Sequence, residues 1–374
     1  MSLTDKVIQY WYGTPGFLFR VFDILSIPFA IINRFVINLR NKHYNKPGIS
    51  KKISCPVISI GNLNVGGVGK TPVTASLAGI LNNNGFKVAI CSRGYKGIGP
   101  FPKIVNPDDK WQSVGDEPLL LSRICKNTPV IVDRDRVRGS EFAIKQTNPD
   151  VIILDDGFQH RALFRNSDWL LIDSVRQFGN NKVFPRGPLR EPVGSIKRCN
   201  LILATNYDPE KFHDPNQPLI KIRKYCSQRG FDRPLATGKA IPEYLTAISD
   251  WNDRKSFDIL KNKPLALIAG IENPSRVMET LQDLQYSIVS KCIFPDHHAY
   301  TADDIKYSVQ KAKSAGAEAF ITTAKDAVKF EPLIEYTELP VWILHISFKI
   351  HSGNEDICME LSRVLGKGIR LDTP

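Results

Sequence analysis

A glycine-rich turn that ends in Lys70 and Thr71 is the part of this sequence best suited to do chemistry. The apolar segment 56–60 before the turn reads as a β-strand, and the segment 72–81 after it reads as an α-helix. Backbone N–H groups of such a turn point at an anion, and the helix N-terminus adds partial positive charge. Lys70 would reach the β- and γ-phosphates of a nucleoside triphosphate, and Thr71 would hold Mg²⁺. The residues predicted to line this nucleotide site are Asn64, Val65, Gly66, Gly67, Val68, Gly69, Lys70 and Thr71.

Asn64 stands where the strict phosphate-loop pattern has its first glycine. Asn tolerates a left-handed backbone better than most residues, so we expect the loop to close through Asn64. Gly66 and Gly67 supply further conformational freedom. The alternative is an ordinary glycine-rich turn between a strand and a helix, which gives no packing reason for Lys70-Thr71 at the helix start.

Asp155 and Asp156 follow the apolar segment 151–154, which reads as a buried strand. In a parallel sheet the carboxyl ends of the strands meet at one edge, so these aspartates are expected beside the phosphate loop, where a carboxylate can hold Mg²⁺. Adjacent carboxylates repel each other unless cations offset them, which a metal ion and Lys70 would do. The alternative is a pair of turn aspartates.

Two further segments carry residues that could act as acid or base. Asp116 and Glu117 precede the apolar helix 119–124, where a carboxylate can accept a proton from an attacking hydroxyl or merely cap the helix. Asp296 and His297 lie in the segment 294–300, where a His–Asp contact could polarise a base, or where both could belong to a surface loop.

The segment 185–192 is rich in proline and carries Arg186, Arg190 and Glu191. These side chains could contact phosphate or Mg²⁺. A proline-stiffened crossover between strands is the alternative.

The composition describes a folded protein with a polyanionic partner. The 374 residues, 42% hydrophobic and 24% charged, suffice for two domains and an appendage. Seven scattered cysteines without a CxxC pair argue against a zinc site or a disulfide framework and favour a reducing compartment. The net charge of +12 suits nucleic acid, an acidic lipid surface or a phosphorylated substrate.

The segment 11–40 is dense in apolar and aromatic residues, and no cleavable signal peptide precedes it. Its longest uncharged run, 24–33, is too short to cross the ~30 Å hydrocarbon layer. Flanking aromatic and basic residues favour a helix that lies in the membrane interface. The alternative is a helix packed on the protein's own core.

Short apolar strands alternate with helices, which predicts an α/β fold with a mostly parallel sheet sandwiched by helices. With the phosphate loop, this pattern is typical of a P-loop NTPase-like fold. The segment 219–239 reads as basic, polar and β-like, and a second αβ pattern begins near residue 265. We therefore expect four parts: a membrane-associated segment (1–50), a P-loop core (51–218), a linker with a β-hairpin (219–255) and a smaller C-terminal α/β domain (256–374).

Taken in order, the runs GNLNVGGVGKTP, SRGY, GDEP, LDDGFQH, PRGPLREP, AGIENPSR, FPDHHAY and TTAKDAVK closely resemble the tetraacyldisaccharide 4′-kinase family of Gram-negative bacteria. The resemblance extends from the N-terminal segment to Lys329, and DDGFQH and GPLREP are its most specific parts. It departs from the family at Glu272, where the family usually has Gly, and the motifs end after Lys329. The resemblance implies transfer of the ATP γ-phosphoryl to the 4′-hydroxyl of a tetraacylated glucosamine disaccharide 1-phosphate, a step of lipid A biosynthesis.

The resemblance also implies a role for each site residue. It places the enzyme at the cytoplasmic face of the bacterial inner membrane, with ATP and Mg²⁺ as cofactors and an anionic membrane surface as a partner. Asp116 is implied as the base, paired with His297 of a second domain across a cleft that must close. The residues implied around the nucleotide and metal are Lys70, Thr71, Asp155, Asp156, Gln159 and Glu191.

Three other functions fit parts of the sequence. A membrane-associated P-loop switch would need a guanine-reading element, and the run Thr323-Ala-Lys325-Asp326 is a weak echo of one. A nucleic-acid-binding ATPase would show a basic stripe interleaved with aromatics, which is not found here, so we expect no nucleic-acid partner. A non-enzymatic membrane protein would leave the carboxylate clusters without a use.

Overall fold

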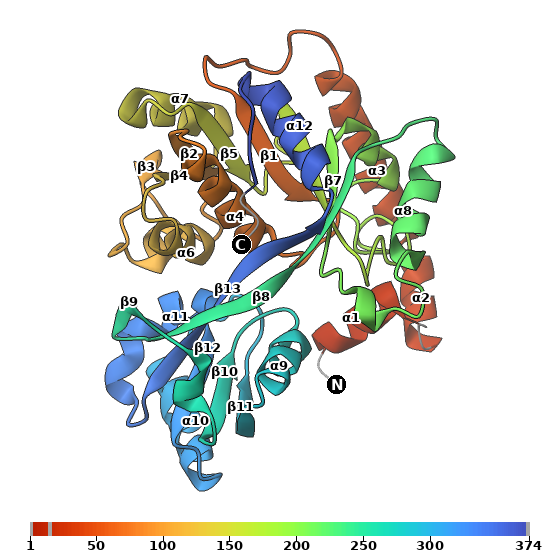
Figure 1. The fold of residues 1–374 in the computed structure, drawn as a ribbon. Helices are drawn as coiled ribbons and strands as arrows, with labels where there is room; N and C mark the ends of the chain where they lie inside the picture. The colour runs from red at the N-terminus through yellow and green to blue at the C-terminus, as the bar shows by residue number, and fades with distance from the viewer. Residues whose placement is uncertain (1–2, 14–16, 372–374) are drawn as a thin grey trace. The chain divides into compact units, whose positions relative to one another are not determined.

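The computed structural model describes residues 3–13 and 17–371 of the chain, which forms two compact units (Figure 1). Unit 1 comprises residues 1–93, 133–239 and 349–374, and unit 2 comprises residues 94–132 and 240–348. The boundaries of these units differ from the domain boundaries predicted from the sequence, because the segment 94–132 belongs to the same unit as most of the C-terminal part of the chain. Within unit 2, helix α6 (Asp116–Ile124) from that segment packs against helix α11 (Ala324–Phe330).

Unit 1 is built on five parallel strands in the order β7-β6-β1-β5-β2. All five are buried along their whole length, as expected for apolar strands with helices on both faces. Ile60 pairs with Asp155, so the carboxyl ends of β1 and β5 meet at one edge. The strands are β1 (Val57–Asn62), β2 (Val88–Ser92), β5 (Val151–Asp155), β6 (Ser167–Asp173) and β7 (Leu201–Thr205).

Helices of unit 1 cover this sheet. The helix predicted at 72–81 is confirmed as α4 (Lys70–Asn83), and α7 spans Arg136–Thr147. The β-like reading of 219–239 is wrong for its first half, because α8 (Gln217–Ser227) occupies it and buries Ile222 and Cys226. A further helix of unit 1, α12, spans Asn354–Leu365.

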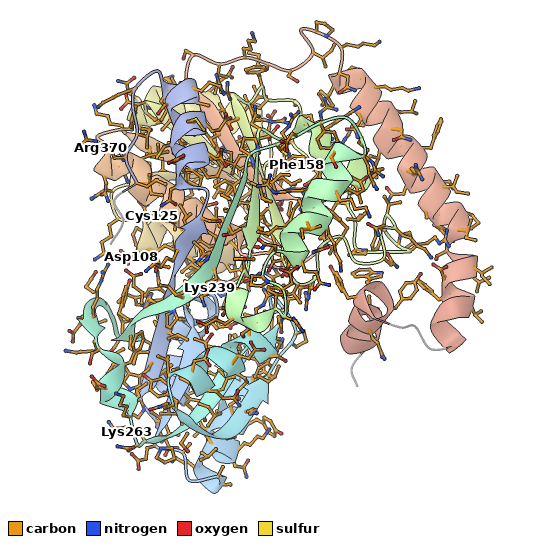
Figure 2. The ribbon with its side chains drawn as sticks, turned by 45° about the vertical axis from the view of Figure 1, so that its right-hand side comes forward. Asp108, Cys125, Phe158, Lys239, Lys263 and Arg370 are labelled. Carbon is orange, nitrogen blue, oxygen red and sulfur yellow. The ribbon has the colours of Figure 1, made fainter. Side chains whose placement is uncertain are left out.

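Phe158, labelled in Figure 2, fixes the edge of the unit 1 sheet where the site lies. Its side chain is fully buried in the apolar core of this unit. A Cβ added to Gly61 would lie only 2.6 Å from the Phe158 Cβ, so β1 needs glycine at this point. This close approach holds the end of β1 against the segment that follows β5.

Unit 2 has a smaller parallel sheet in the order β11-β10-β12-β13. β8 forms an antiparallel hairpin with β9 in this unit, and β3 pairs antiparallel with β4. β8 and β13 each begin in one unit and end in the other. The strands are β3 (Lys103–Ile104), β4 (Val130–Val132), β8 (Leu235–Ala247), β9 (Asp250–Lys255), β10 (Pro264–Ala269), β11 (Ser287–Ile293), β12 (Ala319–Thr323) and β13 (Val341–Ser352). The helices are α5 (Trp111–Val114), α6 (Asp116–Ile124), α9 (Pro274–Asp283), α10 (Ala302–Ser314) and α11 (Ala324–Phe330).

The N-terminal segment forms α1 (Leu3–Tyr12), α2 (Phe17–Leu25) and α3 (Ile27–Tyr44). Asp23 of α2 accepts hydrogen bonds from Lys182 and Arg186, each at a shortest distance of 2.8 Å, which ties these helices to unit 1. Within the described ranges, every helix is too short or too polar to traverse a bilayer.

Candidate active site

The phosphate loop leads from β1 into α4 through a left-handed residue. Gly69 has φ 83° and immediately precedes Lys70, the first helical residue. Two contacts from outside hold the loop: the Thr205 hydroxyl donates to the Val68 carbonyl at 2.8 Å, and the Val65 N–H donates to the Pro188 carbonyl at 2.6 Å. The loop is thereby fixed before any ligand binds, which lowers the entropy cost of binding one.

Asn64 does not act as the sequence predicts. It forms an antiparallel bridge with Leu189, which requires an extended backbone, so the expected left-handed closure is wrong. The Asn64 side chain is buried, and its amide donates to the Gln177 carbonyl at 2.8 Å. Asn64 therefore anchors the start of the loop to a neighbouring segment of unit 1.

Asp155 and Asp156 lie at the end of β5, as predicted, but in different surroundings. Asp155 is almost fully buried and accepts a hydrogen bond from Thr74 at 3.2 Å. Asp156 has a left-handed backbone, with φ 52°, and its carboxylate lies 3.7 Å from the Lys70 amine and 2.9 Å from the Arg190 guanidinium. Burial by itself raises the pKa of Asp156, but Lys70 and Arg190 outweigh it and the pKa falls to about 2. Lys70, Asp156 and Arg190 thus form a charged cluster beside the loop.

Arg136, the first residue of α7, is a buried cation at the same edge that the sequence analysis missed. It donates to the backbone carbonyls of Asp133 and Asp155 at 2.7 and 3.1 Å. Burial lowers the pKa of Arg136 to about 10, which still leaves it charged near neutral pH. A helix start is the only local signal at this position, because the burial of the Arg136 side chain depends on where α7 packs.

The oxygen-rich donors Thr71, Asp155 and Asp156 fit Mg²⁺, which prefers carboxylate and hydroxyl oxygens. Among the described residues, no three acidic, histidine or cysteine side chains cluster tightly enough to form a metal cage. Mg²⁺ commonly needs only one or two carboxylates beside phosphate and water ligands, so the pair of aspartates at the end of β5 is compatible with this ion.

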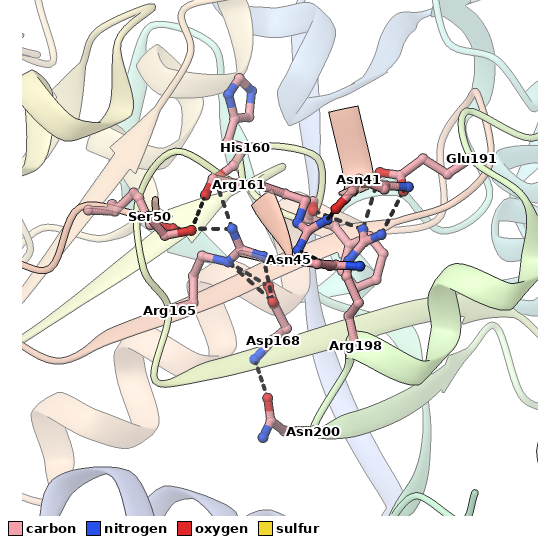
Figure 3. Close-up of polar contacts among 12 residues, drawn as sticks. Asn41, Asn45, Ser50, His160, Arg161, Arg165, Asp168, Glu191, Arg198 and Asn200 are labelled. Atoms are coloured by element: carbon pink, nitrogen blue, oxygen red, sulfur yellow. Dashed lines mark hydrogen bonds and ion pairs between the residues drawn. The ribbon is translucent and has the colours of Figure 1, made fainter. Parts of the chain in front are cut away.

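Glu191 does not fit the metal site for which it was predicted (Figure 3). Its carboxylate is fully buried and faces α3, where it accepts hydrogen bonds from Arg198 at 2.7 Å, Asn41 at 3.2 Å and Arg40 at 3.3 Å. Ser195 donates to the same carboxylate at 2.9 Å. With its oxygens engaged by these donors, Glu191 fastens the C-terminal part of α3 to the proline-rich segment.

Gln159 lies at the edge of the sheet near the phosphate loop. Its side-chain amide donates to the Asn62 carbonyl at the end of β1, at 2.9 Å. Its position beside the strand that feeds the loop is compatible with the predicted nucleotide contact.

Asp116 and His297 are in direct contact inside unit 2. The His297 Nδ1 lies 2.7 Å from the Asp116 Oδ2, and only 4% of Asp116 is exposed. The expected approach across a closing cleft is wrong, because both residues belong to the same unit. The neighbouring His298 is occupied elsewhere, at 3.0 Å from Asp304 in the capping box of α10. The structure therefore separates the two adjacent histidines into one paired with Asp116 and one that stabilises a helix.

Lys325 joins this pair, which the sequence analysis did not foresee. Its amine lies 3.3 Å from the His297 Nε2, 3.2 Å from Asp296 and 3.4 Å from Glu117. Burial raises the pKa of Asp116, but the His297 hydrogen bond and the Lys325 charge outweigh it and lower the pKa. The surrounding carboxylates likewise hold the pKa of Lys325 above its usual range despite burial. The lowered pKa makes Asp116 an ionised carboxylate near neutral pH.

Asp326 is not available to read a guanine base. It is fully buried, and it accepts hydrogen bonds from Tyr300 at 3.1 Å and Thr323 at 2.8 Å. Lys329 lies 3.1 Å from the same carboxylate. The echo of a GTPase element at 323–326 is thus a structural helix start.

The chain matches the family model described as Tetraacyldisaccharide-1-P 4′-kinase over residues 22–365. A Tetraacyldisaccharide 4′-kinase from Syntrophus aciditrophicus is 34% identical over 347 residues, covering 88% of this chain and 90% of the relative. One from Methylobacillus flagellatus is 33% identical over 371 residues, covering 98% and 99%. The crystal structure of LpxK from Aquifex aeolicus in complex with ATP is similar with a TM-score of 0.72 at 29% identity, covering 92% of this chain and 99% of that one.

Proposed function

Because this chain belongs to the tetraacyldisaccharide 4′-kinase family, we propose that its phosphate loop binds the donor nucleotide and that Asp116 accepts the proton of the sugar hydroxyl. The membership confirms the family resemblance of the sequence motifs. The protein is a kinase of lipid A biosynthesis, which transfers the γ-phosphoryl of ATP to the 4′-hydroxyl of tetraacyldisaccharide 1-phosphate. We further assign unit 1 to the P-loop NTPase-like folds, because β1, the phosphate loop and α4 follow one another next to an acidic strand end.

The donor groups of unit 1 suit a triphosphate. The N–H groups that precede α4 and the Lys70 amine would hold the β- and γ-phosphates. Arg190 now faces Asp156, and its planar guanidinium is also suited to a phosphate. When bound, Mg²⁺ at Thr71, Asp155 and Asp156 would neutralise phosphate charge.

The contact between Asp116 and His297 carries the assignment of the base. Asp116 takes the proton of the 4′-hydroxyl while the freed oxygen attacks the γ-phosphorus, and the bond from that phosphorus to the bridging oxygen of ADP breaks. The His297 hydrogen bond keeps the Asp116 carboxylate oriented, and the positive charge of Lys325 favours the ionised form of Asp116. Phosphoryl transfer depends mostly on positioning and charge neutralisation, so no covalent nucleophile is needed.

Transfer of labelled γ-phosphate to the lipid acceptor in detergent micelles tests this division of roles. Lys70→Ala and Asp116→Ala are expected to abolish transfer, with unchanged circular dichroism. A Lys325→Arg control retains the charge beside His297 and should keep most of the activity. Undiminished transfer by Asp116→Ala would remove that residue from the role of base.

We also propose that α2 and α3 lie on the membrane surface, at its cytoplasmic face. Apart from Ile37, the residues of α3 that face the rest of unit 1 are small or polar, whereas large apolar side chains of α3 are exposed. Phe29, Ile32 and Phe35 are 66%, 61% and 62% exposed. This polarity is the reverse of a core-packed helix and suits a helix with its apolar face in lipid. The inward residues are Ser26, Ala30, Asn33, Ile37 and Arg40.

Binding to vesicles that contain anionic lipid tests the membrane role. Phe29→Ser and Phe35→Ser should each weaken partitioning about 10- to 150-fold, which corresponds to about 1.5–3 kcal/mol for one buried aromatic side chain. Tyr307→Ser, an aromatic 61% exposed on α10, is the matched control. Equal vesicle binding by all three variants would contradict the proposal.

A further inference from the structure

His297, which contacts Asp116, has a strained backbone. Its φ is 55°, in the left-handed region that residues other than glycine rarely adopt. Such a conformation persists only where the surrounding structure enforces it, and it is found most often at active sites. The contact of 2.7 Å between His297 and Asp116 therefore depends on how the segment 294–300 is held on both sides of His297.

The first half of this segment is anchored at the end of β10. The Phe294 N–H donates to the Ala269 carbonyl at 2.8 Å, which continues the strand pairing by one step. The His298 N–H donates to the Pro295 carbonyl at 3.1 Å and closes a β-turn that contains His297. The ring of His298 stacks on Phe294, with centres 4.7 Å apart. This side of His297 is held by backbone hydrogen bonds and ring packing.

The second half is anchored by one buried side-chain contact. The Tyr300 hydroxyl donates to the Asp326 carboxylate of α11 at 3.1 Å, and both residues are buried. Asp326 also accepts a hydrogen bond from Thr323 at 2.8 Å. A buried carboxylate is costly unless an opposite charge offsets it, and the Lys329 amine, itself buried, lies 3.1 Å away. Tyr300 is thus tied to a charge-balanced point of α11.

Gly270, the residue after β10, leaves the space in which the two anchors meet. A Cβ added to Gly270 would lie 3.0 Å from the Tyr300 hydroxyl and 3.2 Å from the Asp326 carboxylate. It would also lie 3.1 Å from the carbonyl oxygen of Pro295. These distances are shorter than ordinary van der Waals contact, so a side chain at position 270 would push the anchors apart.

We propose that Tyr300 and Asp326 are positioning residues, which keep His297 against Asp116 during phosphoryl transfer. The inference rests on the proposed function, because it concerns how the base assigned there is held. It gives a use to three sequence runs, AGIENPSR, FPDHHAY and TTAKDAVK, which contribute Gly270, Tyr300 and Asp326. Phosphoryl transfer depends mostly on positioning, and a displacement of about 1 Å far from the reacting atoms can lower a rate about 100-fold.

The experiment compares two tyrosines of unit 2 that differ only in what their hydroxyls hold. Tyr300→Phe removes the hydrogen bond to Asp326. Tyr286→Phe is the matched control, because Tyr286 is 6% exposed against 7% for Tyr300 and its hydroxyl donates to the Phe257 carbonyl at 2.7 Å. Gly270→Ala disturbs the same anchor without removing either partner. Both tyrosine substitutions are also made in the His297→Asn protein, and kcat and KM for ATP and lipid are measured in detergent micelles.

Tyr300→Phe and Gly270→Ala are each expected to lower kcat about 10- to 100-fold, with both KM values unchanged. Tyr286→Phe should keep the wild-type kcat. In the His297→Asn protein, Tyr300→Phe should cause no further loss, because the anchor acts through His297. A general loss of stability would instead lower the activity by the same factor with and without His297.

Two outcomes overturn the inference. One is a kcat of Tyr300→Phe equal to that of Tyr286→Phe, and the other is an equal loss from Tyr300→Phe in the presence and absence of His297. If Tyr300→Phe does not fold, Gly270→Ala made with and without His297→Asn decides by the same criteria. Full transfer by Asp116→Ala would refute the proposed base itself, so the failure of the base and the failure of the positioning role are distinguishable.

Discussion

The contact between Asp116 and His297 predicts how far the double substitution of these two residues lowers the reaction rate, compared with each single substitution. Asp116→Asn removes the proton acceptor, and loss of a general base typically costs about 10²- to 10⁴-fold in rate. His297→Asn leaves the base but removes a 2.7 Å hydrogen bond to a buried carboxylate. Such a bond to a charged group contributes about 1.5–3 kcal/mol, so we expect a loss of about 10- to 150-fold. The double variant should be no slower than Asp116→Asn alone, because orienting an absent base has no value.

The assay is transfer of labelled γ-phosphate to the lipid, with kcat/KM measured for the wild type and the three variants. Equal circular dichroism and equal binding of an ATP analogue would show that each variant is folded and that its phosphate loop is unaffected. If the losses of the two single variants multiply in the double variant, the residues act independently and the pairing has no catalytic role.

The pH dependence of the same variants gives an independent check. In the wild type, burial raises the pKa of Asp116 while the His297 hydrogen bond and Lys325 lower it further than burial raises it. Removing His297 leaves the burial effect in place, so the pKa of Asp116 rises. The acid limb of the kcat/KM profile, which reports the free enzyme, should therefore move to higher pH in His297→Asn. An unmoved acid limb would mean that a group other than Asp116 accepts the proton.

Three further predictions follow from other contacts. Glu191→Gln should lower the free energy of unfolding, measured in urea, by about 3 kcal/mol, because a buried ion pair with Arg198 is broken. The Mg²⁺ concentration for half-maximal activity should stay unchanged. A shift in that concentration would show that Glu191 is a metal ligand. Lys325→Met removes a positive charge close to His297, so the acid limb of kcat/KM should again move to higher pH, whereas Lys325→Arg should leave it in place. Burial lowers the pKa of His160 to about 4, so below pH 6.5 this histidine is protonated in the unfolded chain but still neutral in the folded chain. The free energy of unfolding should therefore fall as the pH drops from 6.5 toward 4. His160→Gln should reduce this pH dependence, measured by urea titrations at several pH values.

The strands and most helices were predictable because their signals are local. The apolar runs at 56–60 and 151–154 are strands in the structure, and the helix predicted at 72–81 is α4. The main error, at 219–239, has a physical cause. The basic and polar residues there lie on the outer side of α8, and only a few buried side chains such as Ile222 and Cys226 mark its inner side. So narrow an apolar stripe gives little helical periodicity.

Partners of charged side chains were much less predictable. Glu191 was expected at the metal ion from the family resemblance and from its place in the proline-rich segment 185–192, yet it is buried against α3, about 150 residues earlier. Lys325 was noticed only as a weak echo of a GTPase motif, and it lies against His297. A charged side chain can be buried only where hydrogen-bond donors or opposite charges offset the cost of removing it from water. The packing of elements distant in the sequence decides where those compensating groups lie.

The sequence by itself determined the phosphate loop, the acidic end of β5 and the kinase family, because each of these signals lies in a short run of consecutive residues. Only the tertiary structure decided that the segment 94–132 joins the C-terminal part of the chain in unit 2, and hence that Asp116 meets a histidine 181 positions away. It likewise decided that α3 turns its apolar side outward, since which face of a helix is buried depends on the surface that receives it.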